Sequence, residues 1–451
     1  WDAFLEAFEY FKKTDQNEKA FSFGSYMPSA GLRLPHQSQL SERLLSLAAN
    51  DTDQEAFARM QHAWVVSVAD GDIERATPHI ERALLLLERS QDVGLSYQIL
   101  GPLVAINGNY LKWDECAAYA LKGIKTADED GNRVDGPGWF WGCSALRVLG
   151  NIKSSRKIAT AMVTEGERMH WQQLILLGKL SLISIDMVEG DWRSAQERIK
   201  QILDATRAEN HPESLKQAEF LIELMSGGDP GRLEELSLLI SSIDYFADRD
   251  NRRVFPLRTA GACGILGLGG WLMRRADLTG RAAEIATLFL GEMPPHVPIN
   301  QQSAKVALAL HAVVTKDSGQ AREMYDSFKS SVGQMAGFDL ISGDRLLGLL
   351  ARELDDNSAA EDHFNAAIEF CRKAGYRPEL AWTMSEYAEM LLDRDGTGDP
   401  STRSAGLGQT GSVRDHDRAV ELQDEAIAIA TELGMKPLLE RVLSQREILK
   451  A

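Results

Sequence analysis

A short stretch near the C-terminus occurs twice, and it limits the possible folds more than any other feature. Residues 367–380 read AIEFCRKAGYRPEL and residues 426–439 read AIAIATELGMKPLL. In both copies a helical run reaches a glycine that ends the helix, and a basic residue and a proline then begin the next helix. We call this Gly-to-Pro turn the joint. Two copies of one helix–turn–helix joint predict an array of helical hairpins.

A second kind of turn recurs through most of the chain, as Gly or Asp followed by Ala and an amphipathic run. Its anchors are Gly71, Gly108, Gly150, Gly190, Gly228, Asp277, Asp317 and Asp355. Neighbouring anchors are about 40 residues apart on average, a spacing typical of helical repeats. From about residue 38 onward the hydrophobic period is helical, and strand-like alternation is missing. These features predict an all-α solenoid in which each hairpin buries its apolar face on its neighbours.

The sequence predicts a short N-terminal part and one long array. Residues 1–35 are expected to form a helix and a loop, and residues 36–451 the repeat array. Within the array, the Gly/Ser/Thr-rich residues 394–415 have little to bury and predict a flexible inserted loop. Residues 437–451 predict a C-terminal capping helix. Because the chain opens on Trp rather than Met, we expect it to be a piece of something longer.

Charge and cysteine content exclude several classes of partner. The net charge of −17 disfavours nucleic acid and anionic membranes, because binding to them depends on Lys and Arg neutralising phosphates. The four cysteines are far apart without a CxxC pair, which excludes a zinc ribbon and favours reduced thiols in the cytoplasm. The longest apolar run, 259–273, is shorter than the roughly 20 residues that span a bilayer. We therefore expect a cytoplasmic protein with no direct nucleic-acid or membrane partner.

One repeat carries small and large residues in the order that lets two helices pack closely. Gly348 is followed twelve positions later by Ala360, and Phe364 and Ala367 complete the stripe. This order resembles the G…A…F…A pattern of the tetratricopeptide repeat. The resemblance implies a right-handed, tetratricopeptide-like α-solenoid of about nine to ten hairpins. The proline of the joint falls later than in the standard repeat, so we expect a longer second helix.

The last repeats narrow this resemblance to one family. The segments AEDHFNAAIEFCRKAGYRPELAWTMSEYAEMLLDRDG and RAVELQDEAIAIATELGMKPLLERVLSQREILKA look like the C-terminal repeats of large bacterial signal-transduction ATPases. That group includes LuxR-type and maltose-regulon-activator-like regulators and cyclase-linked ATPases. The motif resemblance covers roughly residues 340–451, and the rest of the chain fits by periodicity alone. It implies an array that senses a protein, a peptide or a small inducer and signals to a flanking ATPase or output domain.

Sequence motifs for catalysis are missing. The glycine-rich run 261–270 lacks the third glycine of a dinucleotide fingerprint, and no GK[ST] triplet occurs, so close helix packing explains it better. The nine histidines form neither an HExxH motif nor a pair at i and i+4. We therefore predict a non-enzymatic interaction and sensor module without cofactor or metal. The alternative is the regulatory part of an enzyme, an ATPase or a nucleotide cyclase, with a site assembled between repeats.

Aromatic residues in the N-terminal half give the best candidate for a ligand or partner groove. Residues 136–142 read GPGWFWG, and further aromatics occur on neighbouring helices. On the concave side of an array such side chains stack on a sugar or a peptide side chain. The predicted groove residues are Tyr97, Trp139, Trp141, Trp171 and Gln172. The alternative is that the tryptophans of 136–142 form core between repeats.

Overall fold

The computed structural model describes residues 2–25, 37–48, 52–130, 136–205, 213–240, 256–292, 297–337, 340–396 and 408–450. Within these ranges 22 α-helices account for nearly all of the chain. Neighbouring helices pack on one another, as the helical periodicity of the sequence predicts. The predicted all-α class is therefore confirmed.

We divide the described chain into two halves, separated by residues 241–255. The N-terminal half contains α1 (Asp2–Lys13), α2 (Asn17–Ser25), α3 (Gln37–Leu47), α4 (Thr52–Val68), α5 (Ile73–Leu87), α6 (Val93–Asn109), α7 (Trp113–Asp130), α8 (Gly136–Val148), α9 (Ile152–Met169), α10 (Gln172–Glu189), α11 (Trp192–Ala205), α12 (Glu213–Ser226) and α13 (Pro230–Ile240). The C-terminal half contains α16 (Pro256–Leu272), α17 (Ala276–Glu292), α18 (Pro298–Thr315), α19 (Ser318–Phe328), α20 (Gly343–Glu353), α21 (Asn357–Ala374), α22 (Arg377–Gly396), α23 (Gly408–Leu433) and α24 (Lys436–Lys450).

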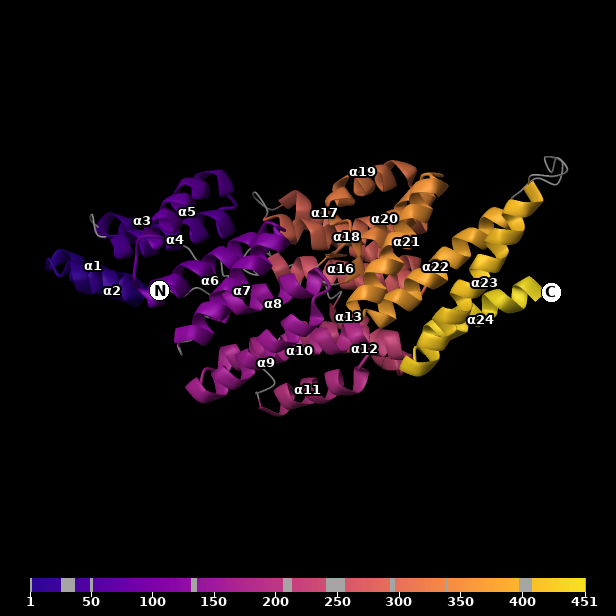
Figure 1. Ribbon diagram of the computed structural model, residues 1–451, viewed down its shortest axis with the longest axis horizontal. Coiled ribbons are helices and arrows are strands. Elements are labelled where there is room, and N and C mark those ends of the chain that lie inside the picture. Colours follow the sequence, from indigo (N-terminus) through magenta and orange to yellow (C-terminus); the bar gives the residue numbers. More distant parts are fainter. Residues whose placement is uncertain are drawn as a thin grey trace.

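Each helix packs on the next, and alternate helices also touch. The series α4, α6, α8 and α10 makes such contacts in the N-terminal half, and the series α16, α18 and α20 makes them in the C-terminal half. This arrangement buries one apolar face of every helix between two neighbours. Figure 1 shows α1–α5 at one end of the long axis and α23 and α24 at the other end.

The chain also returns on itself, so that the two halves touch. The helix pairs α6–α18, α10–α22, α12–α16 and α12–α24 are in contact although most of them are distant in sequence. In Figure 1, α9 and α11 follow one edge of the molecule, and α17 and α19 follow the opposite edge. The contacts between halves involve the inner, alternate helices of each series.

Most turns between paired helices contain a residue in the left-handed conformation. Positive φ angles occur at Gly71, Leu111, Gly150, Gly190, Gly227, Arg274, Lys316 and Asp355. Each of these residues lies at or within about three residues of a turn anchor expected from the sequence. Both joints also end their first helix as predicted, because Gly375 and Gly434 have φ of 80° and 70°.

Small residues bring the helices together where the sequence suggested. A β-carbon added at Gly348 would lie 3.2 Å from the ring of Phe364, so the Phe364 ring packs directly on Gly348. The glycine-rich run is part of α16. A β-carbon at Gly267 would lie 2.8 Å from the backbone of Ala307 on α18, and one at Gly269 would lie 2.6 Å from the ring of Phe220 on α12. The interpretation of this run as a packing surface is confirmed.

The connection from α19 to α20 contains strands that the sequence did not predict. A 3₁₀ turn, η2 (Lys329–Ser331), leads into β1 (Met335–Ala336), which pairs antiparallel with β2 (Ile341–Ser342). Both strands are fully buried. We call the described residues of this connection, 329–337 and 340–342, the hairpin. Its strands are too short to show a readable period-2 pattern, which is why they could not be predicted from the sequence.

Element boundaries differ from the expected ones at both ends of the chain. Residues 1–35 were expected to hold one helix and a loop, but two helices, α1 and α2, occur there; residues 26–36 lie outside the described part. The predicted inserted loop, residues 394–415, extends too far at both ends, because α22 continues to Gly396 and α23 begins at Gly408. Residues 397–407 are not among the described residues. The C-terminal helix α24 packs on α23 and also on α12, so it contacts both halves.

Candidate functional site

The aromatic residues predicted to line a groove are largely packed in the core. Trp139 and Trp141 on α8 are 8% and 9% exposed, and Tyr97 on α6 is also buried. A β-carbon at Gly108 would lie 2.4 Å from the Trp141 ring, so this ring fills the space that the glycine leaves. Gly101 and Gly138 also let α6 and α8 approach closely, since a β-carbon at Gly138 would lie 2.7 Å from the backbone of Gly101. The burial agrees with the core interpretation of these tryptophans, and a ligand role for them stays a prediction.

Trp171 and Gln172 lie apart from this packed group, at the start of α10. Trp171 precedes the helix and is half-buried, and its carbonyl accepts the backbone N–H of Leu174. Gln172 is exposed. The structure therefore brings together the aromatic residues of α6 and α8. Trp171 and Gln172 belong to a different pair of helices, α9 and α10.

The clearest convergence of distant residues is where the two joints meet turns of the N-terminal half. A β-carbon at Gly150 would lie 2.9 Å from Cβ of Ala374, next to the first joint. One at Gly190 would lie 2.7 Å from Leu433, next to the second joint. In a third contact of this kind, the turn at residue 227 lies against residues 436–437. We call these three contacts together the seam. It joins three consecutive turns of one half to two joints of the other.

Aromatic donors fasten the seam from both sides. The Nε1 of Trp192, on α11, donates a hydrogen bond of 2.9 Å to the carbonyl of Leu433. The hydroxyl of Tyr376, in the first joint, donates to the carbonyl of Arg147. Both acceptors lie in the last turn of a helix, where carbonyls have no partner within the helix. The seam therefore uses helix ends as its polar contacts.

Beside the seam lies a cavity of about 60 Å³ that both halves line. The N-terminal half contributes Met187, Trp192 and Met225, among others. The C-terminal half contributes Leu268 of α16 and Tyr376 of the first joint, with residues of the hairpin. A larger hollow of about 190 Å³ lies between α11, α12 and α13, so it is confined to one half.

The hairpin closes one side of this cavity. Met335 and Leu340 line it, and the hairpin backbone is held by side chains of the surrounding helices. The backbone N–H of Gly337 donates to Oε1 of Gln302 on α18, at 3.1 Å. The N–H of Ser342 donates to Oε1 of Glu379 on α22, at 2.7 Å. The backbone of the hairpin is therefore anchored to both α18 and α22.

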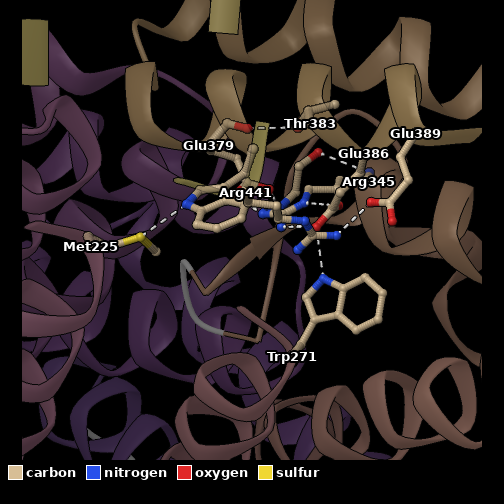
Figure 2. A network of polar contacts seen from close by, with 10 residues as sticks. Met225, Trp271, Arg345, Glu379, Thr383, Glu386, Glu389 and Arg441 are labelled. Carbon is tan, nitrogen blue, oxygen red and sulfur yellow. Dashed lines mark hydrogen bonds and ion pairs between the residues drawn. The ribbon is translucent and has the colours of Figure 1, made fainter. Parts of the chain in front are cut away.

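Behind Glu379 lies a buried cluster of charges. Arg345 on α20 is fully buried, and its Nε and Nη2 each donate a hydrogen bond of 2.8 Å to the carboxylate of Glu386. Its Nη1 donates to Glu379 at 2.7 Å. Trp271 Nε1 donates to Glu386 as well, at 2.8 Å. Figure 2 shows Arg345 between the two carboxylates, with Trp271 below them.

The two carboxylates differ in how well they are compensated. Burial raises the pKa of Glu379, and the charge of Arg345 opposes this only in part. Burial also acts to raise the pKa of Glu386, but the charge and the two hydrogen bonds of Arg345 hold this pKa below its ordinary value. One arginine between two buried carboxylates forms a structural ion cluster, because all three guanidinium nitrogens are used.

Arg441 of α24 extends the cluster to the C-terminal helix. Its guanidinium lies 5.7 Å from the ring centroids of both Trp271 and Trp382, and it pairs with Glu389 at 2.7 Å. The indole N–H of Trp382 points to the sulfur of Met225 on α12, at 3.3 Å. Contacts of this cluster therefore run from α12 through α16 and α22 to α24, across the boundary between the halves (Figure 2).

A separate chain of polar groups links α19, α20 and α21. Nδ1 of the half-buried His363 lies 3.1 Å from the buried carboxylate of Asp344. Its Nε2 lies 3.0 Å from the hydroxyl of Tyr325. Asp344 also accepts the N–H of Gly333 in the hairpin, at 2.6 Å. Asp344 and Tyr325 thus contact the two ring nitrogens of His363 from opposite sides.

The residues of the buried charge cluster were not predicted, although their pattern in the sequence is distinctive. Glu379 and Glu386 are seven residues apart on one helix, and Arg345 directly precedes the apolar run of α20. Charges at helical spacing on otherwise apolar faces indicate buried pairs. The seam residues carry no such signal, because Tyr376 and Trp192 read as ordinary apolar positions.

Within the described ranges, no group of three or more His, Cys, Asp and Glu side chains is arranged to hold a metal ion. Of the helices described, none has the length and apolarity that crossing a bilayer requires. All four cysteines are buried and free. Comparison with known proteins gave no match, either to a family model or to a curated protein sequence.

Proposed function

We propose that the chain is a tetratricopeptide-like α-solenoid with a period near 40 residues, as in the C-terminal repeats of large bacterial signal-transduction ATPases. The left-handed residues of successive turns, from Gly71 to Asp355, support this period. Contacts between alternate helices support the stacking of hairpins. The resemblance of the last repeats to those ATPases supports the family.

We further propose that the array is a cytoplasmic, non-enzymatic interaction and sensor module of a signal-transduction or transcription regulator. It binds a small inducer, a protein or a peptide and passes the signal to a flanking ATPase or output domain. The observation that carries this proposal is the cavity beside the seam, because its walls come from both halves. Small-molecule sites occur preferentially at such boundaries.

A ligand in this cavity touches both halves at once, so it binds better when the seam is closed. By linkage, its binding energy then shifts the equilibrium between closed and open seams. Trp192 and Tyr376 line the cavity and also make the two hydrogen bonds of the seam. A ligand against these rings therefore acts directly on the polar contacts that hold the halves together.

The test is a thermal-shift screen against sugars, nucleotides, peptides and apolar metabolites, followed by hydrogen exchange. A true ligand raises the unfolding temperature in proportion to RT ln(1+[L]/Kd). We expect it also to slow amide exchange in the turns at residues 150 and 190 and in both joints. A ligand that stabilises the protein but leaves exchange at the seam unchanged contradicts the sensor proposal.

The alternative function is the regulatory part of an ATPase or cyclase, with a site assembled between repeats. The observation that favours it is the chain Asp344–His363–Tyr325, in which a buried carboxylate orients a histidine toward a hydroxyl. Such a relay activates a hydroxyl in many enzymes. Nucleotide hydrolysis by the purified chain that disappears in His363→Gln would favour this alternative over the sensor.

A further inference from the structure

We propose that the cavity beside the seam takes an uncharged apolar group, the alkyl end of a small inducer, rather than a sugar, a nucleotide or an anion. This inference rests on the proposed sensor function and names the ligand class for the same site. It follows from three properties of the cavity: the state of its polar groups, the chemistry of its walls and its size.

The polar side chains at the cavity wall already have partners within the protein. Trp192 donates to Leu433 and Tyr376 donates to Arg147. Both carboxylate oxygens of Glu379 accept hydrogen bonds, one from the hairpin backbone and one from Arg345. A ligand hydroxyl or carboxylate in the cavity would break one of these bonds or remain without a partner. An unsatisfied buried polar group costs about 1–3 kcal/mol, so polar ligands are disfavoured.

The rest of the wall is apolar and adaptable. Three methionines, Met187, Met225 and Met335, come from α10, α12 and the hairpin, so three separate segments contribute one each. Methionine has a flexible, polarizable side chain that fits apolar groups of irregular shape. The other apolar lining residues are Val188, Leu221, Leu268, Leu340 and Pro378. A wall of this kind binds hydrocarbon by dispersion and by release of poorly hydrated surface.

The volume sets the size of the group. An engineered apolar cavity of about 150 Å³ holds benzene, which corresponds to about 25 Å³ for each carbon atom. On this scale the 60 Å³ cavity holds about two or three carbon atoms. An ethyl or propyl end of a ligand fits, and so does a xenon atom. The remainder of such an inducer would extend out of the cavity.

The test uses the whole chain with ¹³C-labelled methionine methyl groups, observed by NMR while xenon or propane is added. We expect saturable shifts of the methyl signals of Met187, Met225 and Met335. The signals of Met169, which is exposed, and of Met324, which is buried elsewhere, serve as internal controls and stay in place. Propanoate and ethylammonium, which have similar size but carry charge, should give no saturable shift.

A variant with a filled cavity tests the same proposal without assignment of the methionine NMR signals. Leu221→Phe should remove the xenon response, whereas Leu288→Phe, at an exposed position of α17, should keep it. If Leu221→Phe does not fold, Leu268→Phe gives the same test from the other half. Saturable binding of propanoate or ethylammonium, with no response to xenon or propane, overturns the apolar ligand class and leaves the sensor proposal standing. Binding of xenon and propane without slower exchange at the seam supports the ligand class and contradicts the sensor proposal.

Discussion

The hydroxyl of Tyr376 donates a hydrogen bond to the backbone carbonyl of Arg147, 229 residues earlier in the chain. Trp192 makes the reciprocal contact, because its indole N–H donates to the carbonyl of Leu433, 241 residues later. Each half thus supplies one aromatic donor to a helix end of the other half. These two bonds fasten the seam, on which the proposed sensor function depends.

Removing the tyrosine hydroxyl should loosen the seam without disturbing either half. Tyr376→Phe leaves the carbonyl of Arg147 with one partner fewer, and a hydrogen bond of this kind contributes about 0.5–1.5 kcal/mol. We expect faster amide exchange in the turn at residue 150 and little change in α4 and α5. Tyr10→Phe is the control, since Tyr10 is 61% exposed. Equal exchange in both variants would contradict a role for this bond.

Breaking the buried charge cluster should cost far more than breaking a surface pair. Arg345→Met leaves two buried carboxylates without their cation, and the loss of one partner from a buried pair costs about 3–5 kcal/mol. The control is Arg193→Ala, because Arg193 pairs with Glu197 while 90% of its side chain is exposed. Denaturant unfolding of both variants measures the difference. A loss of stability as small as that of Arg193→Ala would show that the cluster contributes little.

Packing of Trp141 on Gly108 predicts opposite effects for two glycine-to-alanine changes. Gly108→Ala places a methyl group against the indole ring, and overpacking of this kind costs about 1–3 kcal/mol. Gly291→Ala, on α17, meets nothing within 4 Å and should leave stability unchanged or raise it by up to about 1 kcal/mol. Unfolding temperatures of the two variants give the comparison. A neutral Gly108→Ala would mean that the ring is free to move away, as a ligand-binding aromatic would be.

Acid should weaken the N-terminal repeats through His62. Burial, with the nearby charges of His79 and Arg75, lowers the pKa of His62 to about 4. In the unfolded chain this pKa is about 6.5. Because the unfolded state binds the proton first, stability is unaffected above about pH 6.5 and falls between about pH 6.5 and pH 4. The loss from this group amounts to about 3 kcal/mol at most.

The measurement compares unfolding of the wild-type chain and of His62→Gln in the same buffers. The variant loses the contact between His62 and Ser41, so it should be less stable near pH 7. Its stability should nevertheless fall less steeply between pH 6.5 and pH 4. Parallel curves for the two proteins would show that His62 titrates normally.

The sequence was informative about local structure and less so about contacts between distant segments. Helix periodicity, the glycines of the joints and the turn anchors predicted the all-α class and most turn positions, because these features depend on neighbouring residues. Packing of Gly348 on Phe364 also followed from the spacing of residues on α20 and α21. The hairpin was missed, since its strands of two residues leave no pattern in the sequence.

The candidate site could not be predicted, because it depends on contacts between helices that are distant in sequence. The contact of Tyr376 with Arg147 joins residues 229 positions apart, and no local pattern indicates it. The exposure of aromatic residues depends on the same geometry. For Trp141 the sequence left both a groove and a core open, and the close approach of Gly108 agrees with the core interpretation.

The contact of the first joint with the turn at Gly150 is tested most directly by a disulfide. The double variant Gly150→Cys/Ala374→Cys places two thiols across the seam, where the β-carbons would lie 2.9 Å apart. The β-carbons of a disulfide lie about 3.5–4.5 Å apart, so the bond forms with a shift of about 1 Å between the turn and the joint. Gly333→Cys/Ala374→Cys is the matched control, because Gly333 also has a positive φ but meets nothing within 4 Å. Mild oxidation followed by mass spectrometry should show the cross-linked peptide in the first variant and not in the control. Equal cross-linking in the two variants, or none in either, would contradict the seam.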